Sequence, residues 1–160
     1  MYIIFITLLG FLTRFIYADQ SFWLDEGASL MFAKLSLPQL FEAIKSDFHP
    51  PLFYLLLKFW LPVSGNSEWL IRLPFIIIAT LTIPVVYMLC QSLFGKKSLV
   101  PAVASLLLAI NPLHIYYSQE LRMYSLATLL VVLSWYFLIK RKYFLLSVIN
   151  ILCLYTFYGR

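Results

Sequence analysis

The chain has 160 residues, of which 62% are hydrophobic and only 12% are charged, and its formal net charge is +5 at pH 7. A water-soluble domain of this size would need a more polar surface, so the composition excludes a soluble globular protein and predicts an all-α integral membrane protein. The sequence also lacks a glycine-rich phosphate loop and a nucleophile elbow, which excludes a soluble nucleotide-binding fold. No basic stripe is present, and we therefore expect no nucleic acid among its partners.

The first predicted crossing covers residues 1–18 and is apolar except for Arg14. At about 1.5 Å per residue this segment is just long enough to cross a bilayer. It lacks a basic start and a convincing cleavage site, so we interpret it as a retained crossing rather than a signal peptide. Residues 19–72 then form a long polar-rich loop with six of the seven acids.

Two short helices are predicted within this loop. The first covers residues 25–34, and the second starts after Ser36, a candidate N-cap with Gln39 at the capping-box position. Helical spacing of its apolar residues predicts an amphipathic helix on the membrane surface; these are Leu37, Leu40, Phe41 and Ile44. Residues 52–60 are apolar but about half a bilayer long, and they could form a short or tilted crossing or a re-entrant half-helix.

Four further crossings are predicted over residues 73–94, 98–117, 123–139 and 143–158, giving about five in all. The basic runs 96–97 and 140–142 both lie in short loops between them. By the positive-inside rule both runs face the cytoplasm. The polar loop 19–72 and the turn 118–122 then share the outer face, and the N-terminus lies inside.

Adjacent acids follow Trp23 at the predicted outer surface. Asp25 and Glu26 cannot face the same way on a helix, so one could act as a base while the other binds a partner or caps the helix. The alternative is a helix cap beside a solvated acid. Arg14 and Arg72 lie near the ends of apolar segments, where ionisable groups are functional candidates, although snorkelling is the simpler reading.

The run 116–124 places a carboxylate, a guanidinium and three phenols between two apolar segments. Glu120, Arg122 and Tyr124 could form an anion site, because guanidinium forks match phosphate oxygens, or Glu120 and Arg122 could be a solvated turn pair. His49 and His114 are far apart and no cysteines are paired in sequence, so no zinc or other metal site is predicted.

Taken in order, five segments resemble the GT-C class of polyprenyl-phosphate-sugar-dependent glycosyltransferases, in the group related to protein O-mannosyltransferases and the lipid A aminoarabinose transferase. The matching segments are Thr13-Arg14-Phe15, Trp23-Leu24-Asp25-Glu26-Gly27, His49-Pro50-Pro51-Leu52, Arg72-Leu73-Pro74 and residues 117–124. Members of this class are several times longer, so the resemblance implies that the chain is the N-terminal part of such an enzyme.

The resemblance implies a lipid-linked sugar donor on a polyprenyl phosphate carrier and an acceptor hydroxyl on a protein, a lipid or a glycan. Asp25 would deprotonate the acceptor, which attacks the anomeric carbon with inversion while the lipid phosphate leaves. Glu26 or Glu120 would orient the acceptor or an arginine. The phosphate would be held by Arg14, Arg72 and Arg122, with His49 in support. No cofactor is required, although a divalent cation near Asp25 is compatible with the chemistry.

The same resemblance implies a bacterial or archaeal plasma membrane with the active site on the outer face. Many relatives carry Asp where this chain has Tyr124, so the role of that position stays open. Two other classes also fit the pattern. One is a transporter or flippase-like membrane protein with buried charges, and the other is a non-catalytic fragment that serves assembly or anchoring.

Overall fold

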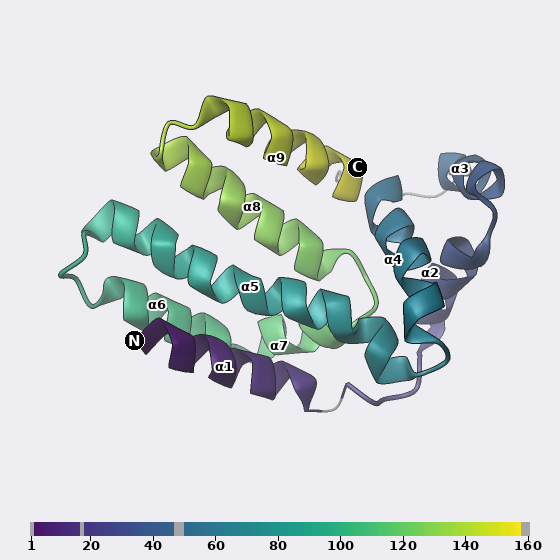
Figure 1. Ribbon diagram of the computed structural model, residues 1–160, viewed down its shortest axis with the longest axis horizontal. Coiled ribbons are helices and arrows are strands. Elements are labelled where there is room, and N and C mark those ends of the chain that lie inside the picture. The colour runs from purple at the N-terminus through teal and green to yellow at the C-terminus, as the bar shows by residue number, and fades with distance from the viewer. Residues whose placement is uncertain (1, 17, 47–49, 158–160) are drawn as a thin grey trace.

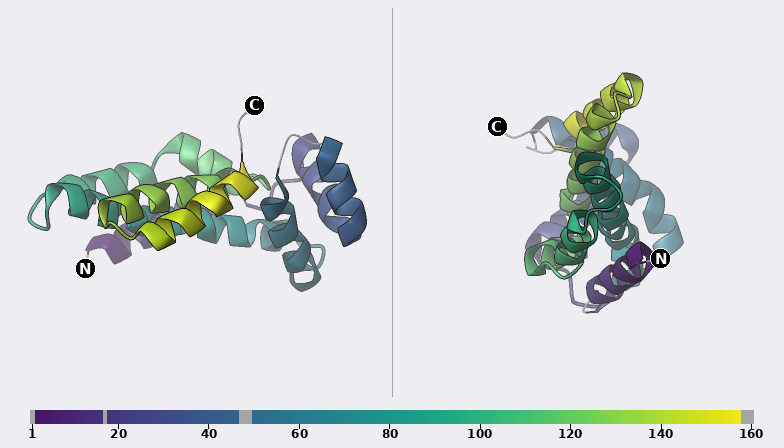
Figure 2. Two further views of the ribbon diagram at one scale, coloured as in Figure 1. Left: turned by 90° about the horizontal axis from the view of Figure 1, so that it is seen from above. Right: turned by 90° about the vertical axis from the view of Figure 1, so that its left-hand side faces the viewer.

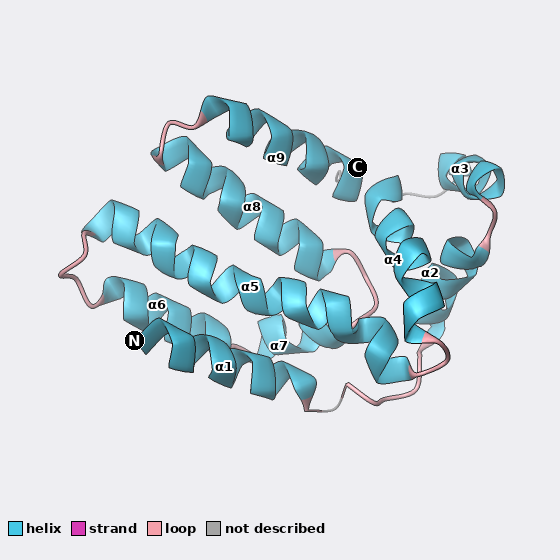
Figure 3. Ribbon diagram, viewed as in Figure 1, coloured by secondary structure: helices cyan, strands magenta, loops and turns pink. Residues whose placement is uncertain are grey.

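The computed structural model describes residues 2–16, 18–46 and 50–157, and over these ranges it is helical with no strand (Figure 1, Figure 3). This confirms the predicted all-α class. The helices are α1 (Tyr2–Phe15), α2 (Leu24–Lys34), α3 (Leu37–Ser46), α4 (Pro51–Ser64), α5 (Glu68–Phe94), α6 (Val100–Ala109), α7 (Pro112–Gln119), α8 (Tyr124–Ile139) and α9 (Tyr143–Thr156).

The longest helix, α5, lies at the centre of an elongated bundle. Helices α1, α6 and α8 contact it along its length, and α9 packs beside α8 (Figure 1). Helices α2, α3 and α4, here called the loop cluster, gather at one end of the bundle (Figure 1 and the left view of Figure 2). The predicted polar loop is therefore a compact helical unit.

The two basic turns lie at the end of the bundle opposite the loop cluster. Figure 1 shows the α5–α6 turn and the α8–α9 turn at the same end as the start of α1. The α7–α8 turn, which contains Glu120, lies at the other end with the loop cluster. The predicted grouping of these segments is confirmed, whereas the end that faces the cytoplasm stays a prediction.

Helix α5 begins earlier than its hydropathy predicts. Ser67 is extended, and Glu68 in the first turn places a negative charge where the helix dipole favours it. Gly95, with φ of 85°, ends the helix. The helix therefore begins before residue 73, so Arg72 lies inside α5, whereas the residue at which the crossing begins stays a prediction. The 27 residues span about 40 Å, which is enough to cross a bilayer.

The predicted crossing 98–117 corresponds to two helices, α6 and α7, bent by 52° relative to each other. Pro112 explains the break, because it lacks the N–H that would bond to the carbonyl of Leu108. Asn111 then starts α7, its side chain accepting the backbone N–H of His114 at 2.9 Å. The last carbonyls of α6 are left to find donors elsewhere in the fold.

The loop cluster agrees closely with the predicted helices. Helix α2 starts one residue before the predicted 25–34. Ser36 precedes α3, and its backbone N–H donates to the Gln39 side chain at 3.1 Å, which is one half of a capping box. Leu40 of α3 is fully buried in the core of the cluster, whereas Phe41 is 48% exposed. Contact of α3 with a membrane surface stays a prediction.

By length and hydropathy, α5 is the one described helix that could cross a membrane alone. The bent pair α6–α7 would count as a second span, and α1, α4, α8 and α9 are apolar but shorter. Large apolar side chains are nevertheless exposed on several of these helices, for example Phe5, Trp135 and Phe144. Such surfaces are rare in contact with water. The count of about five crossings stays a prediction, as does the role of α4 as a crossing or a re-entrant helix.

Candidate active site

A buried ion pair joins the loop cluster to the central helix. The Arg72 guanidinium donates from Nη2 to Oε2 of Glu26 at 2.6 Å and from Nε to Oε1 at 2.9 Å. Both side chains are at most 3% exposed. A two-point contact of this kind fixes orientation as well as distance. It ties the first turn of α2 to the second turn of α5.

Both partners of this pair have further hydrogen bonds within the protein. Nη1 of Arg72 donates to the carbonyls of Ala18, at 3.0 Å, and Gln20. Oε1 of Glu26 accepts the backbone N–H of Leu121 at 2.8 Å, and Oε2 accepts that of Trp23 at 3.3 Å. The pair therefore fixes three chain segments around itself: the end of the α1–α2 connection, the start of α2 and the α7–α8 turn.

A polar cavity of about 450 Å³ lies directly beside this ion pair. Its lining residues come from the α1–α2 connection, α2, α5 and the end of α7: Gln20, Ser21, Trp23, Glu26, Arg72, Tyr116, Gln119 and Glu120. Two aromatic rings at its edge are substantially exposed, Trp23 at 48% and Tyr116 at 56%. The cavity thus combines carboxylates, amides and aromatic faces, a set of groups that suits a polar ligand with hydroxyls.

Glu120 is the titratable group of this cavity whose proton affinity is most clearly altered. Burial raises the pKa of its carboxyl above the ordinary value of 4.5, and the negative charges of Glu26 and Asp25 raise it further. A hydrogen bond from Tyr116 and the positive charge of Arg122 act in the opposite direction. A carboxyl with a raised pKa beside a cavity holds its proton to a higher pH than an ordinary glutamate does, which makes Glu120 a candidate for proton exchange.

Asp25 lies next to Glu26 but in a different environment. It occupies the first turn of α2, where a negative charge is favoured, and its side chain is partly exposed. Among the described residues, no hydrogen bond or ion pair engages its carboxylate. Its negative charge is the smallest of the contributions that raise the pKa of Glu120, after burial and the charge of Glu26. Of the two adjacent acids, Glu26 is held in place and Asp25 is accessible.

Arg14 lies away from the polar cavity, between α1 and the break in α6–α7. It is fully buried, and it donates from Nη2 to the Leu108 carbonyl at 3.0 Å and from Nη1 to the Ala109 carbonyl at 2.9 Å. Nη1 also bonds Gly10 of its own helix at 2.8 Å, and Nη2 bonds Nδ1 of His114 at 2.8 Å. Arg14 therefore supplies the donors that α6 lost at Pro112.

The other predicted site residues are divided between locations. Arg122 is half-buried in the α7–α8 turn, close enough to Glu120 to lower its pKa. Tyr124 faces Tyr117, with 4.8 Å between ring centroids, and lines a different cavity. His49 lies outside the described residues. The structure thus brings Asp25, Glu26, Arg72, Glu120 and Arg122 to one end of the molecule and separates Arg14 and Tyr124 from the polar cavity.

Sequence reasoning gave no individual role to several residues that shape the site, although Tyr116 is one of the three phenols of the run 116–124 and Trp23 lies in a segment that resembles the family. Gln119 donates from its side chain to the carbonyl of Arg14 at 3.1 Å and to that of Ile16, which closes the end of α1. Tyr116 bonds Glu120, and Trp23 and Gln20 line the cavity. The one available signal was the position of Gln119 and Tyr116 in the polar run before Glu120. Across the described residues, no group of three His, Cys, Asp or Glu side chains has the arrangement of a metal site.

Comparison with known protein families identifies the family to which the chain belongs. A family model described as dolichyl-phosphate-mannose-protein mannosyltransferase matches residues 48–143, more than half of the chain. The match includes α4 to α8 and therefore Arg72, Glu120 and Arg122, whereas Asp25 and Glu26 precede it. No curated protein and no solved structure was found to match.

The family match assigns this helical chain, with its polar cavity at one end of an apolar bundle, to the GT-C class of membrane glycosyltransferases. Within that class, the chain belongs to the dolichyl-phosphate-mannose-protein mannosyltransferase family. Proteins of this family are integral to membranes and use lipid-linked sugar donors, which agrees with the apolar surfaces of the bundle.

Proposed function

We propose that the chain takes part in transferring a sugar from a polyprenyl phosphate to an acceptor hydroxyl at the outer face of a bacterial or archaeal plasma membrane. The observation that carries this proposal is the different state of the two adjacent acids. Glu26 has its carboxylate oxygens engaged by Arg72 and two backbone N–H groups. Asp25, one residue earlier, has a partly exposed carboxylate at the same end of the molecule.

In the proposed reaction, Asp25 acts as the general base. The acceptor hydroxyl gives its proton to the Asp25 carboxylate, and the hydroxyl oxygen forms a bond to the anomeric carbon of the donor sugar. The bond from that carbon to the phosphate oxygen breaks with inversion, and its electron pair leaves on the lipid phosphate. The leaving group is a stable anion, so the protein has to position it and balance its charge.

Glu26 and Arg72 support this reaction as positioning residues. By holding the start of α2 against α5 and the α7–α8 turn, they fix the direction of the Asp25 side chain relative to the cavity. We propose that Arg122 and His49 contact the phosphate. Arg14 and Arg72 act indirectly, since their guanidinium groups already bond backbone carbonyls, an imidazole and a carboxylate.

The polar cavity is the proposed place for the reacting hydroxyls. Glu120, whose raised pKa favours exchange of a proton, would orient the acceptor by a hydrogen bond. The exposed faces of Trp23 and Tyr116 bound the same space.

The test is Asp25→Asn in the full coding sequence, expressed in membranes and assayed with lipid-phosphate-linked sugars. General base catalysis contributes about 10²–10⁴-fold, so we expect a loss of that size with normal membrane insertion. Asp19→Asn is the matched control, because it removes an exposed acid from the same loop and should leave transfer within about twofold. Transfer retained by Asp25→Asn would remove this residue from the mechanism.

The break between α6 and α7 is the feature that bears on the transporter or flippase-like alternative. Broken helices at membrane depth, with backbone carbonyls freed for binding, are typical of transporters. Here the freed carbonyls of Leu108 and Ala109 are bonded by Arg14, which favours a structural break instead. If the protein moves a lipid-linked sugar from one leaflet of a vesicle membrane to the other without transferring the sugar to an acceptor, the flippase-like alternative would be supported.

A further inference from the structure

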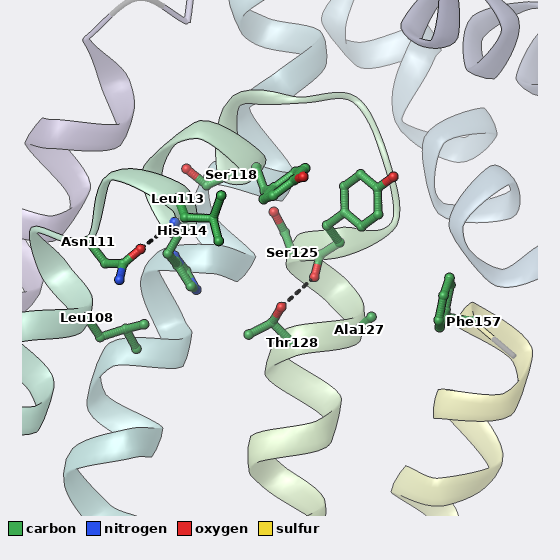
Figure 4. A pocket seen from close by; sticks show the side chains of 11 residues that line it. Leu108, Asn111, Leu113, His114, Ser118, Ser125, Ala127, Thr128 and Phe157 are labelled. Atoms are coloured by element: carbon green, nitrogen blue, oxygen red, sulfur yellow. Dashed lines mark hydrogen bonds between the residues drawn. The ribbon is translucent and has the colours of Figure 1, made fainter. Parts of the chain in front are cut away.

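A second cavity of about 430 Å³ lies between α7 and the start of α8, apart from the polar cavity. No Asp, Glu, Lys or Arg side chain lines it; its walls are Leu108, Asn111, Leu113, His114, Tyr117, Ser118, Tyr124, Ser125, Ala127, Thr128 and Phe157. Figure 4 shows the side chains of His114 and Ser125 on opposite sides of this space, His114 from α7 and Ser125 from α8. Its surface is mainly apolar, with a few polar groups.

Two polar atoms in this lining are buried and have no hydrogen-bond partner among the described residues, Nε2 of His114 and Oγ of Ser125. Other hydroxyls of the same lining are engaged. Ser118 donates to the Ile115 carbonyl at 2.6 Å, and Thr128 donates to the Tyr124 carbonyl at 2.8 Å (Figure 4). An unpaired buried polar atom costs about 1–3 kcal/mol, so two of them around one cavity indicate a ligand with complementary atoms.

The contact with Arg14 determines which imidazole nitrogen of His114 accepts a hydrogen bond and which one donates. A guanidinium can only donate, so Nδ1 of His114, 2.8 Å from Nη2, must accept. The proton of the neutral imidazole is then on Nε2, and this buried nitrogen is an unpaired donor on a residue that lines the cavity. Ser125 is 3% exposed and offers a second donor. A ligand with acceptor oxygens can therefore bond both of these uncharged groups, the Nε2–H of His114 and the hydroxyl of Ser125.

Charge distinguishes the remaining ligand classes. Phosphate oxygens are usually held by Arg or Lys, which form charge-assisted hydrogen bonds. No such side chain lines this cavity, so its donors suit neutral oxygens, such as ester carbonyls. The apolar remainder suits hydrocarbon chains, because it removes them from contact with polar surroundings.

We propose that this cavity binds a membrane glycerolipid, whose ester carbonyls accept hydrogen bonds from Nε2 of His114 and Oγ of Ser125 and whose acyl chains lie against α6 and α8. This site is separate from the polar cavity and does not depend on the sugar-transfer reaction. Bound lipid would stabilise the break between α6 and α7, since His114 links the ligand to Arg14 and through it to the end of α6.

The experiment uses the full-length protein in lipid nanodiscs that contain a phosphatidylcholine with a photoactivatable diazirine on one acyl chain. After illumination, cross-linked peptides are mapped by mass spectrometry. We expect labelling of the segment 108–128, and we expect Ser125→Ala to lower it about fivefold, which corresponds to one neutral hydrogen bond. Because the hydroxyl has no partner in the protein, the same variant should keep wild-type thermal stability.

A second groove in the same protein provides the control. It has a similar volume of about 480 Å³ and is lined by Ile3, Ile4, Thr7, Leu8, Phe11, Thr80 and Pro84. None of these residues has a buried polar atom without a hydrogen-bond partner. Labelling there should be unchanged by Ser125→Ala. His114→Phe is a second variant, expected to lower labelling of 108–128 together with a loss of stability, because it also removes the acceptor for Arg14.

Two results would overturn the proposal. If Ser125→Ala leaves the labelling of residues 108–128 unchanged, lipid contacts this face only as part of the surrounding bilayer and not at a specific site. Displacement of the label by polyprenyl phosphate, but not by unlabelled phosphatidylcholine, would mean that the cavity belongs to the sugar carrier. Displacement by unlabelled phosphatidylcholine alone would support the glycerolipid, whether or not Asp25→Asn abolishes transfer.

Discussion

The buried pair of Glu26 and Arg72 should dominate the stability of the end of the molecule that holds the polar cavity. In Arg72→Met, the Glu26 carboxylate would stay buried with only the backbone N–H groups of Trp23 and Leu121 to bond it. Removing one partner of a buried ion pair costs about 3–5 kcal/mol. The carbonyls of Ala18 and Gln20 would lose their donor as well, so we expect a loss in the upper part of that range.

The assay is unfolding of the purified full-length protein from mild detergent micelles by SDS, followed by tryptophan fluorescence and circular dichroism. Lys45→Met is the matched control, because it breaks the exposed pair of Lys45 and Glu42, whose side chains are 71% and 74% exposed. A pair of this kind contributes less than about 1 kcal/mol.

A double-mutant cycle separates the pair from its surroundings. Glu26→Gln keeps an oxygen for the backbone N–H groups but removes the charge. The loss of unfolding free energy in the double variant with Arg72→Met should therefore be smaller, by about 2 kcal/mol or more, than the sum of the losses in the two single variants. The reasoning would be refuted if Arg72→Met cost no more than Lys45→Met, or if the two single losses simply added.

Three further changes test the rest of the fold. Arg14→Met should leave the carbonyls of Leu108 and Ala109 with only their longer hydrogen bonds, from the Asn111 N–H at 3.4 Å and the Thr13 hydroxyl at 3.3 Å. It should therefore speed hydrogen exchange at residues 106–116 more than in the loop cluster, as measured by mass spectrometry. Pro112→Ala should restore a donor for Leu108 and slow exchange at residues 110–113, and no change there would show that the break does not depend on Pro112. Glu120 has a raised pKa, so its folded form binds the proton more tightly than the unfolded chain does; its contribution to stability is present below about pH 4.5 and is lost as pH rises through the raised pKa. Glu120→Gln should therefore flatten the decline of the SDS midpoint with rising pH, and an unchanged profile would assign that decline to another group.

The grouping of segments could be predicted because it depends on local composition. Apolar runs between polar turns determine where helices begin and end, and clustered lysines and arginines indicate which turns share a face. The helix boundaries differ from those that local hydropathy indicates. Arg72 is polar and yet continues α5 because Ser67 and Glu68 begin the helix earlier. Pro112 lies in an apolar run and yet ends α6.

The contacts of the candidate site could not be predicted to the same extent. Glu26 and Arg72 are 46 residues apart, and Arg14 and His114 are 100 apart. No periodicity in one sequence connects positions at such separations. The sequence identified the charged residues near apolar segments, but whether a guanidinium binds a ligand or a backbone carbonyl depends on which helix ends lie beside it.

Those helix ends explain why the two buried arginines occur where they do. At low dielectric a carbonyl without a donor is costly, and water is not available to bond it. Arg14 bonds the end of α6, Gln119 bonds the end of α1, and Arg72 bonds Ala18 and Gln20 where the chain leaves α1. These three side chains come from segments that resemble family motifs, and each is engaged in joining segments at the same end of the bundle. The donors of these three side chains are largely used within the fold, so we expect proton transfer at this end of the molecule to depend on the acids Asp25 and Glu120.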